Sequence, residues 1–330
     1  MRNVVFVALL LCSYLPARAE VSMEHPVEVL DIHRSPPNLP CADPCNRTAV
    51  LFVHGFNGDR TTWQNGDVQW PELLADDPQI GSDLDVYRLD YFSTLTQGAA
   101  VPKLSKMIAE RLDQKFFGDS AQPSPQTAYS KIVMVCHSLG GILCRNYLLH
   151  VKLRWGHQFL SLMRATITLG TPLNGSELAN FLVLSSNEQR RVLRPQDVND
   201  FLQLLNDSTA EFELKRNYLS CPRIVLYAGY EMQDTPLVEG VPIPFYRVVP
   251  QDSATLDVNT SYTKGFAMDH RQLAKPADRD APQYKWVKNI LQACKSETRD
   301  ISPTTGEITE CGERASYICG QPPWMLPGNR

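Results

Sequence analysis

The chain has 330 residues, of which 43% are hydrophobic and 21% charged. It is therefore long enough to bury a large core, and its composition is that of a globular protein rather than a disordered one. Its net charge is −4 and it contains no basic run, which excludes nucleic acid as an expected partner because such binding depends on Lys and Arg.

The N-terminal segment has the pattern of an export signal. An apolar run from Val4 to about Leu15 follows one early arginine and ends in small residues. The run is too short to span a bilayer comfortably, and its end fits cleavage before Glu20, although a retained membrane anchor is the alternative. We expect residues 1–19 to be a signal peptide and the mature protein to be secreted, into either a periplasmic or an extracellular space.

Short apolar runs then alternate with helical patterns along the chain. Strands that are apolar along their whole length are typical of a parallel sheet covered by helices on both faces, so we expect an α/β fold with a mostly parallel central sheet. The predicted strands are Ala49–Val53, Asp85–Phe92, Lys131–Val135, Ala165–Gly170, Arg223–Gly229 and Phe245–Val249, and the predicted helices are Val101–Phe116, Gly140–Trp155 and Pro282–Ala293.

A polar, helix-prone insertion at residues 176–220 interrupts this alternation and predicts a helical cap or lid. We expect one domain over residues 20–295 that carries this insertion, followed by a polar tail at residues 296–330. The apolar side chains of the insertion suit a lipid-like acyl chain, but packing in the core would account for them equally well. They are Phe181, Leu182, Leu184, Phe201, Leu202, Leu204 and Leu205.

Eight cysteines follow residue 19. Pairs that are close in sequence are expected to form disulfides in an oxidising compartment, whereas Cys136 and Cys144 lie in apolar segments and are expected to be buried thiols. No paired Cys/His spacing of a zinc site occurs, so no metal is expected. The expected disulfides are Cys41–Cys45, Cys311–Cys319 and, over a longer span, Cys221–Cys294.

The stretch VMVCHSLGGILC, from Val133 to Cys144, places Ser138 between a buried strand and a helix. The pattern approaches G-x-S-x-G, in which small residues flank a serine on a strained strand-to-helix turn. Cys136 replaces the first glycine but is small enough to fit. We therefore predict Ser138 as a nucleophile, with a serine that merely caps the helix as the alternative.

A serine nucleophile needs a base and an acid. In α/β sheets that carry the serine on such a strand-to-helix turn, the acid and the base follow it in the chain. His270 is the histidine that lies in the C-terminal region where the base belongs. Glu231 comes two residues after the strand that ends at Gly229 and is the favoured acid, with Asp234 and Asp252 as alternatives.

The developing oxyanion needs backbone N–H donors. We expect these donors to be Leu139, at the helix start, and Phe56, in the turn His54-Gly55-Phe56 after the first predicted strand. His54, Gly55 and His137 are expected to support the site rather than to react.

Four segments, LFVHGFNGD, CHSLGG, LGTPLNGS and DHRQLAKPADR, occur in this order between Ala49 and Val287. Together they resemble the lipase-like serine esterases of the α/β-hydrolase superfamily, including the GPI inositol-deacylase-like group. The resemblance implies an α/β-hydrolase fold and an ester hydrolase with Ser138 as nucleophile and His270 as base. Cys136 departs from the family pattern, and so does Leu173, which stands where related sequences often have a histidine.

The sequence thus predicts a secreted hydrolase of carboxylic esters that forms an acyl-enzyme and requires no cofactor. Its substrate would be a small-molecule or lipid ester, with transient contact to a membrane surface as one further expectation. A thioesterase or acyltransferase with the same three residues is the alternative among enzymes. A catalytically silent binding protein of the same fold is the alternative outside them.

Overall fold

The computed structural model describes most of the expected domain. The expected signal peptide and nearly all of the 176–220 insertion lie outside the described residues. So do five cysteines of the expected disulfides: Cys41, Cys45, Cys221, Cys311 and Cys319. The described residues are 27–33, 47–56, 58–92, 101–118, 129–160, 162–175, 205, 224–236, 245–256, 258, 262–296, 300–301 and 308–309.

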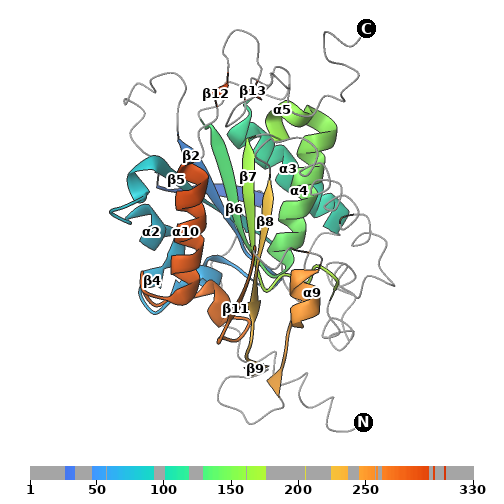
Figure 1. Ribbon diagram of the computed structural model, residues 1–330. Helices are drawn as coiled ribbons and strands as arrows, with labels where there is room; N and C mark the ends of the chain where they lie inside the picture. The colour runs from blue at the N-terminus through green and yellow to red at the C-terminus, as the bar shows by residue number, and fades with distance from the viewer. Residues whose placement is uncertain are drawn as a thin grey trace.

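A seven-stranded sheet forms the centre of the fold (Figure 1). Its strands are β1 (Val27–His33), β2 (Thr48–Val53), β5 (Leu84–Tyr91), β6 (Lys131–His137), β7 (Met163–Leu169), β8 (Val225–Glu231) and β11 (Thr263–Phe266). Their order across the sheet is β1-β5-β2-β6-β7-β8-β11. Strand β1 runs antiparallel to β5, and every other pair is parallel, as the apolar runs predict.

Helices cover both faces of this sheet (Figure 1). In β2, Ala49, Leu51 and Val53 belong to one core cluster, whereas Val50 and Phe52 belong to the other. This alternation is what a strand with two covered faces requires. The first cluster includes side chains of α3 (Val101–Phe116) and α4 (Leu139–Trp155), and the second includes those of α2 (Trp70–Ala75) and α10 (Pro282–Ser296).

The remaining described elements are short. They are the helices α5 (His157–Leu160) and α9 (Gln251–Thr255), the 3-10 helices η1 (Arg60–Trp63), η2 (Gly81–Asp83) and η5 (Gln272–Ala274), and the strand pairs β3 (Gln64–Asn65) with β4 (Val68–Gln69), β9 (Thr235–Pro236) with β10 (Phe245–Tyr246), and β12 (Asp300–Ile301) with β13 (Ile308–Thr309). Within the described part of the chain, no helix is both long and apolar enough to cross a membrane.

The two edges of the sheet differ from the sequence prediction. The expected strand Phe245–Val249 shortens to β10, which pairs with β9 outside the central sheet. The strand that does close the sheet is β11, whose sequence Thr-Lys-Gly-Phe contains no apolar run. The strand at the other edge is β1, which precedes the first predicted strand. Charged residues interrupt the apolar ones in its sequence, Val-Glu-Val-Leu-Asp-Ile-His, because most of its side chains are partly or fully exposed.

The chain order creates a switch point beside β2. Strand β2 lies between β5 and β6, so the chain leaves it toward one side and later returns on the other. In open α/β sheets, ligands bind outside the carboxyl ends of the strands at such a point. The carboxyl ends of β2, β6, β7 and β8 are therefore where a site is expected.

Candidate active site

Ser138 lies at this edge, between the last residue of β6 and the first residue of α4. Its φ of 54° and ψ of −127° make it the one described non-glycine residue with a positive φ. Such a conformation costs roughly 1–3 kcal/mol and persists only where the surroundings hold it. The backbone N–H of Ser138 donates to the carbonyl of Leu169, at 2.9 Å, and the serine stays partly exposed.

Close packing explains the small residues around Ser138. A Cβ on Gly140 would lie 2.3 Å from the carbonyl oxygen of Val53 and 2.4 Å from that of His54. A Cβ on Gly55 would lie 2.6 Å from the Cβ of Ser138. The start of α4 and the turn after β2 therefore interlock around the serine, and neither glycine leaves room for a side chain.

A serine on a strained strand-to-helix turn, at the carboxyl edge of a mostly parallel sheet, is the geometry of a nucleophile elbow. The strand order and the two-sided helical cover complete the arrangement. The chain has the α/β-hydrolase fold.

Comparison with known proteins gives likenesses of fold alone. No protein-family model and no curated protein matches this chain. The lipase BlEst2 of Bacillus licheniformis, in its mature form, is 18% identical over 82% of this chain and 97% of its own, with a TM-score of 0.48. A lipase-esterase related protein from Clostridium acetobutylicum is 14% identical over 81% and 99%, with a TM-score of 0.41. A monoacylglycerol lipase from Paleococcus ferrophilus is 15% identical over 75% and 94%, with a TM-score of 0.41.

The predicted base and the favoured acid meet at the same edge of the sheet. His270 follows β11, and its Nδ1 lies 3.0 Å from Oε2 of Glu231, the last residue of β8. Glu231 is fully buried, and its second oxygen, Oε1, accepts the backbone N–H of Val249 at 2.8 Å. Both carboxylate oxygens therefore have a donor, which orients the carboxylate toward the imidazole.

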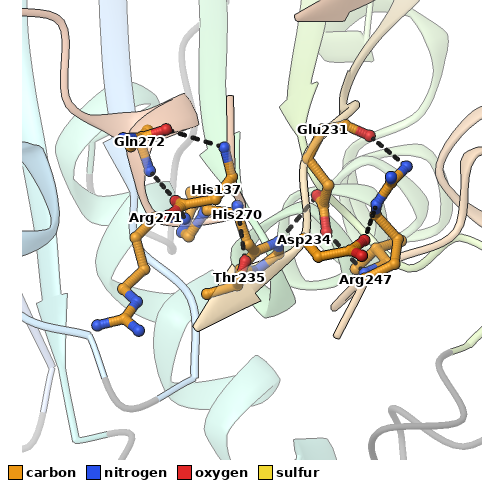
Figure 2. A network of polar contacts seen from close by, with 10 residues as sticks. His137, Glu231, Asp234, Thr235, Arg247, His270, Arg271 and Gln272 are labelled. Atoms are coloured by element: carbon orange, nitrogen blue, oxygen red, sulfur yellow. Dashed lines mark hydrogen bonds and ion pairs between the residues drawn. The ribbon is translucent and has the colours of Figure 1, made fainter. Parts of the chain in front are cut away.

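The backbone of His270 is held from two sides (Figure 2). Its N–H donates to Oγ1 of Thr235, at 3.0 Å, and its carbonyl accepts a hydrogen bond from Nε2 of His137, at 2.9 Å. The turn also closes on itself, because Asp269 accepts the N–H groups of Arg271 and Gln272. The position of the imidazole is therefore fixed by β9 and by the residue that precedes Ser138.

Arg247 belongs to no motif in the sequence, yet it holds the turn that follows Glu231 (Figure 2). Its guanidinium donates to the carbonyl oxygens of Glu231, at 3.1 Å, and Met232, at 2.9 Å. A third bond joins its Nε to Oδ1 of Asp234, at 3.0 Å. Nothing in the sequence pairs Arg247 with this turn, because the contact depends on β10 folding back along β9.

The two alternative acids lie elsewhere. Asp234 is exposed and pairs with Arg247 rather than with the imidazole of His270. Asp252 is an exposed residue in the first turn of α9. Among the described carboxylates, the one that bonds the His270 ring is that of Glu231.

Gly170, directly after β7, lies against this pair. Its φ is +57°, and a Cβ there would be 2.8 Å from Nδ1 of His270 and 2.9 Å from Oε2 of Glu231. Its N–H donates to the carbonyl of Gly229, at 2.8 Å. Two features therefore require a glycine at this position of the Leu-Gly-Thr-Pro segment: its left-handed backbone conformation and the close approach of the His270 and Glu231 side chains.

His137 is buried and neutral. Burial, and secondarily the neighbouring His270, lowers the pKa of His137 to about 3. Its Nε2 must carry the hydrogen because the carbonyl of His270 only accepts, and its buried Nδ1 has no hydrogen-bond partner. A second proton on Nδ1 would therefore be a buried charge without an acceptor, which agrees with the low pKa.

His54 supports the turn after β2. Its Nδ1–H donates to the carbonyl of Gly55, at 2.9 Å, and its ring stacks on Tyr91 with centroids 4.1 Å apart. The Tyr91 hydroxyl donates to the carbonyl of His54, at 2.6 Å. Burial lowers the pKa of His54, so this imidazole is also neutral. The turn leads directly into Phe56, a predicted oxyanion donor, and the other predicted donor, Leu139, is the first residue of α4.

The prediction that Cys136 and Cys144 are thiols is wrong, because they form a disulfide. Their Cα atoms are 6.8 Å apart, although eight positions separate them in the chain. The strand-to-helix reversal at Ser138 brings the end of β6 over the second turn of α4, and this proximity is not visible in either apolar segment alone. Cys294 of α10 is buried, and its expected partner Cys221 lies outside the described residues.

Leu173 and Leu205 both lie in the core. Leu173 packs with Leu226, Ala228 and Val258. Leu205, from the expected insertion, is buried in the α4 face, and its carbonyl accepts a bond from Arg145, at 3.0 Å. For Leu205, the structure thus favours core packing. No cluster of His, Cys, Asp or Glu suited to a metal ion occurs in the described part of the chain.

Proposed function

We propose that this α/β-hydrolase is a secreted serine esterase that cleaves carboxylic esters. In this proposal Ser138 is the nucleophile, His270 the general base and Glu231 the acid. The observation that carries the proposal is the bond between His270 Nδ1 and Glu231 Oε2 at the sheet edge that also presents the strained Ser138 turn. A buried carboxylate that fixes an imidazole at the same sheet edge as a strained serine, whose side chain makes no capping hydrogen bond, supports nucleophilic catalysis better than a helix-capping role.

The reaction would proceed in two halves. Because Nδ1 of His270 is bonded to Glu231, Nε2 is the nitrogen that would take the proton of the Ser138 hydroxyl as its oxygen attacks the ester carbonyl. The imidazolium that forms is stabilised by the Glu231 carboxylate and returns the proton to the departing alcohol. In the second half, His270 takes a proton from the water that attacks the acyl-serine and then returns it to the departing Ser138 oxygen.

The negative charge on the carbonyl oxygen would be stabilised by the backbone N–H groups of Leu139 and Phe56. Leu139 begins α4, where N–H groups point out of the helix end. Phe56 follows the His54–Gly55 turn, which lies directly against Ser138. Loss of one such donor typically costs about 2.7–4 kcal/mol in the transition state.

The class of ester rests on the sequence. The apolar side chains of the 176–220 insertion other than Leu205 suit an acyl chain of a lipid-like ester, with transient contact to a membrane surface. The resemblance to the GPI inositol-deacylase-like group stays a prediction. Export is supported by the signal-like first 19 residues and by the Cys136–Cys144 disulfide, a type of bond that persists in oxidising compartments.

The proposal is tested by steady-state hydrolysis of p-nitrophenyl esters of increasing chain length, with purified mature protein and Ser138→Ala. We expect turnover by the wild type and its loss in the variant. Parallel assays with acyl thioesters and with added alcohol acceptors examine the thioesterase and acyltransferase alternatives. A folded wild-type protein that turns over no acyl substrate would leave the silent binding protein as the better account.

A further inference from the structure

The Cys136–Cys144 disulfide closes a covalent ring around the Ser138 turn. Cys136 lies in β6, two residues before the serine, and Cys144 lies in α4, six residues after it. Both side chains are buried, with exposed fractions of 0% and 2%. The ring therefore links the strand that ends at the elbow to the helix that starts from it.

The residues inside this ring make the contacts that define the candidate site. His137 bonds the carbonyl of His270, at 2.9 Å, and Ser138 has the strained backbone. Leu139 begins α4, and Gly140 presses against the carbonyl oxygens that end β2. A change in the spacing of β6 and α4 would displace all four residues together.

In the part of the chain that the structure describes, backbone hydrogen bonds also hold the strained turn. The Ser138 N–H donates to Leu169, at 2.9 Å, and the Gly141 N–H donates to the Ser138 carbonyl, at 3.0 Å. A strained conformation persists only when its surroundings over-determine it. In G-x-S-x-G sequences the first glycine has no side chain that could bond to the helix, whereas Cys136 forms a covalent bond to Cys144 of α4.

We propose that the Cys136–Cys144 disulfide positions Ser138, so that ester hydrolysis reaches its full rate only when this pair is oxidised. The proposal rests on the esterase function proposed above. Forming the bond removes two protons and two electrons from the two thiols, and a disulfide oxidant such as oxidised glutathione accepts them and becomes two glutathione thiols. Because both sulfurs are buried, the oxidant must reach them before folding is complete, which ties maturation of the enzyme to an oxidising compartment.

The test compares wild type with Cys136→Ala/Cys144→Ala, each unfolded and refolded either with reduced or with oxidised glutathione. The measured quantities are the labelling rate of Ser138 by a fluorophosphonate per folded molecule, and kcat and KM for a short-chain ester. We expect reduction to lower kcat of the wild type about tenfold with little change in KM, since small misplacements of reacting groups cost this much or more. Refolding with oxidised glutathione should restore the wild type.

The double variant should show the lower rate after either treatment. Cys294→Ala, which removes a buried cysteine on the opposite face of the sheet, is the matched control and should label like wild type. Cys144→Ala, which keeps the strand-side cysteine, replaces the double variant if that protein does not fold.

Two results would overturn the positioning role. One is an oxidised Cys136→Ala/Cys144→Ala variant that labels as fast as oxidised wild type. The other is an equal loss on reduction in both proteins, which would assign the effect to another cysteine pair. Oxidised, folded wild type that never labels would overturn the esterase proposal itself, and this outcome is distinct from the other two.

Discussion

The imidazole of His137 donates a hydrogen bond to the main-chain carbonyl of His270, at 2.9 Å. The two rings lie 4.7 Å apart between centroids. The side chain next to the candidate nucleophile thus holds the backbone of the candidate base, although 133 positions separate the two residues. Strain at Ser138 and placement of His270 are therefore parts of one local structure.

Removing this bond should affect catalysis more than substrate binding. His137→Phe keeps a ring but has no donor for the His270 carbonyl, and a net hydrogen bond is worth about 0.5–1.5 kcal/mol. We expect kcat on a short-chain ester to fall roughly 2- to 13-fold with KM nearly unchanged. His137→Gln, whose amide offers an N–H, should lose less. Equal losses in the two variants would contradict a role for the donor.

Stability should depend on pH through the buried imidazoles. His137 has a pKa of about 3 in the folded protein and an ordinary value of 6.5, so between these limits the unfolded state binds a proton that the folded state does not. The free energy of unfolding therefore falls as pH is lowered from 6.5, by about 1.4 kcal/mol per pH unit for this one group. Urea unfolding between pH 7 and pH 5 should show a smaller slope for His137→Gln than for wild type. Equal slopes would show that His137 titrates normally.

Glu231 and Asp234 lie three positions apart, but their substitution should change kcat to very different extents. Glu231→Gln keeps the shape of the side chain and removes the charge that stabilises the imidazolium, so we expect kcat to fall about 10²- to 10⁴-fold. Asp234→Asn weakens only the exposed pair with Arg247, which is worth roughly 0–1 kcal/mol. The matched measurement is kcat for both variants at one pH. A larger loss of kcat in Asp234→Asn than in Glu231→Gln would show that Glu231 is not the acid.

Gly170→Ala should disable the site through the space it fills. Its Cβ would lie 2.8 Å from His270 Nδ1. Gly66→Ala is the matched control, because Gly66 has the same φ of +57° and nothing within 4 Å of the added Cβ. Both variants should lose about 1–2 kcal/mol of unfolding free energy from the left-handed backbone. Only Gly170→Ala should also lose kcat, by roughly 10²-fold, and normal kcat in that variant would refute the close approach.

Local sequence patterns predicted the centre of the fold because its strands are buried on both faces. Residues 49–53 and 132–135 are continuous apolar runs, and the polar His-Ser pair after the second run indicated the turn at Ser138. The sheet edges gave no such signal. Strand β11 is a four-residue segment with lysine and glycine in it, so only its pairing with β8 makes it a strand.

The contacts that hold the candidate site escaped prediction for a related reason. Thr235 and Arg247 are ordinary polar residues in sequence, and they acquire a role only when β9 and β10 lie beside the end of β8. Cys136 and Cys144 lie in two elements with unlike periodicity, and a strand-to-helix reversal brings them together. Chain order predicts the types of residues that a site needs, but these supporting contacts depend on tertiary packing.

The measurement that tests the central claim most directly is covalent labelling of the mature, oxidised protein by a fluorophosphonate, followed by mass mapping of the modified peptide. Ser138→Ala and Glu231→Gln are the comparison proteins. We predict one adduct per molecule on Ser138, none in Ser138→Ala, and much slower labelling in Glu231→Gln. A folded wild-type protein that stays unlabelled, or that carries its adduct on another residue, would contradict the assignment of Ser138 as the nucleophile.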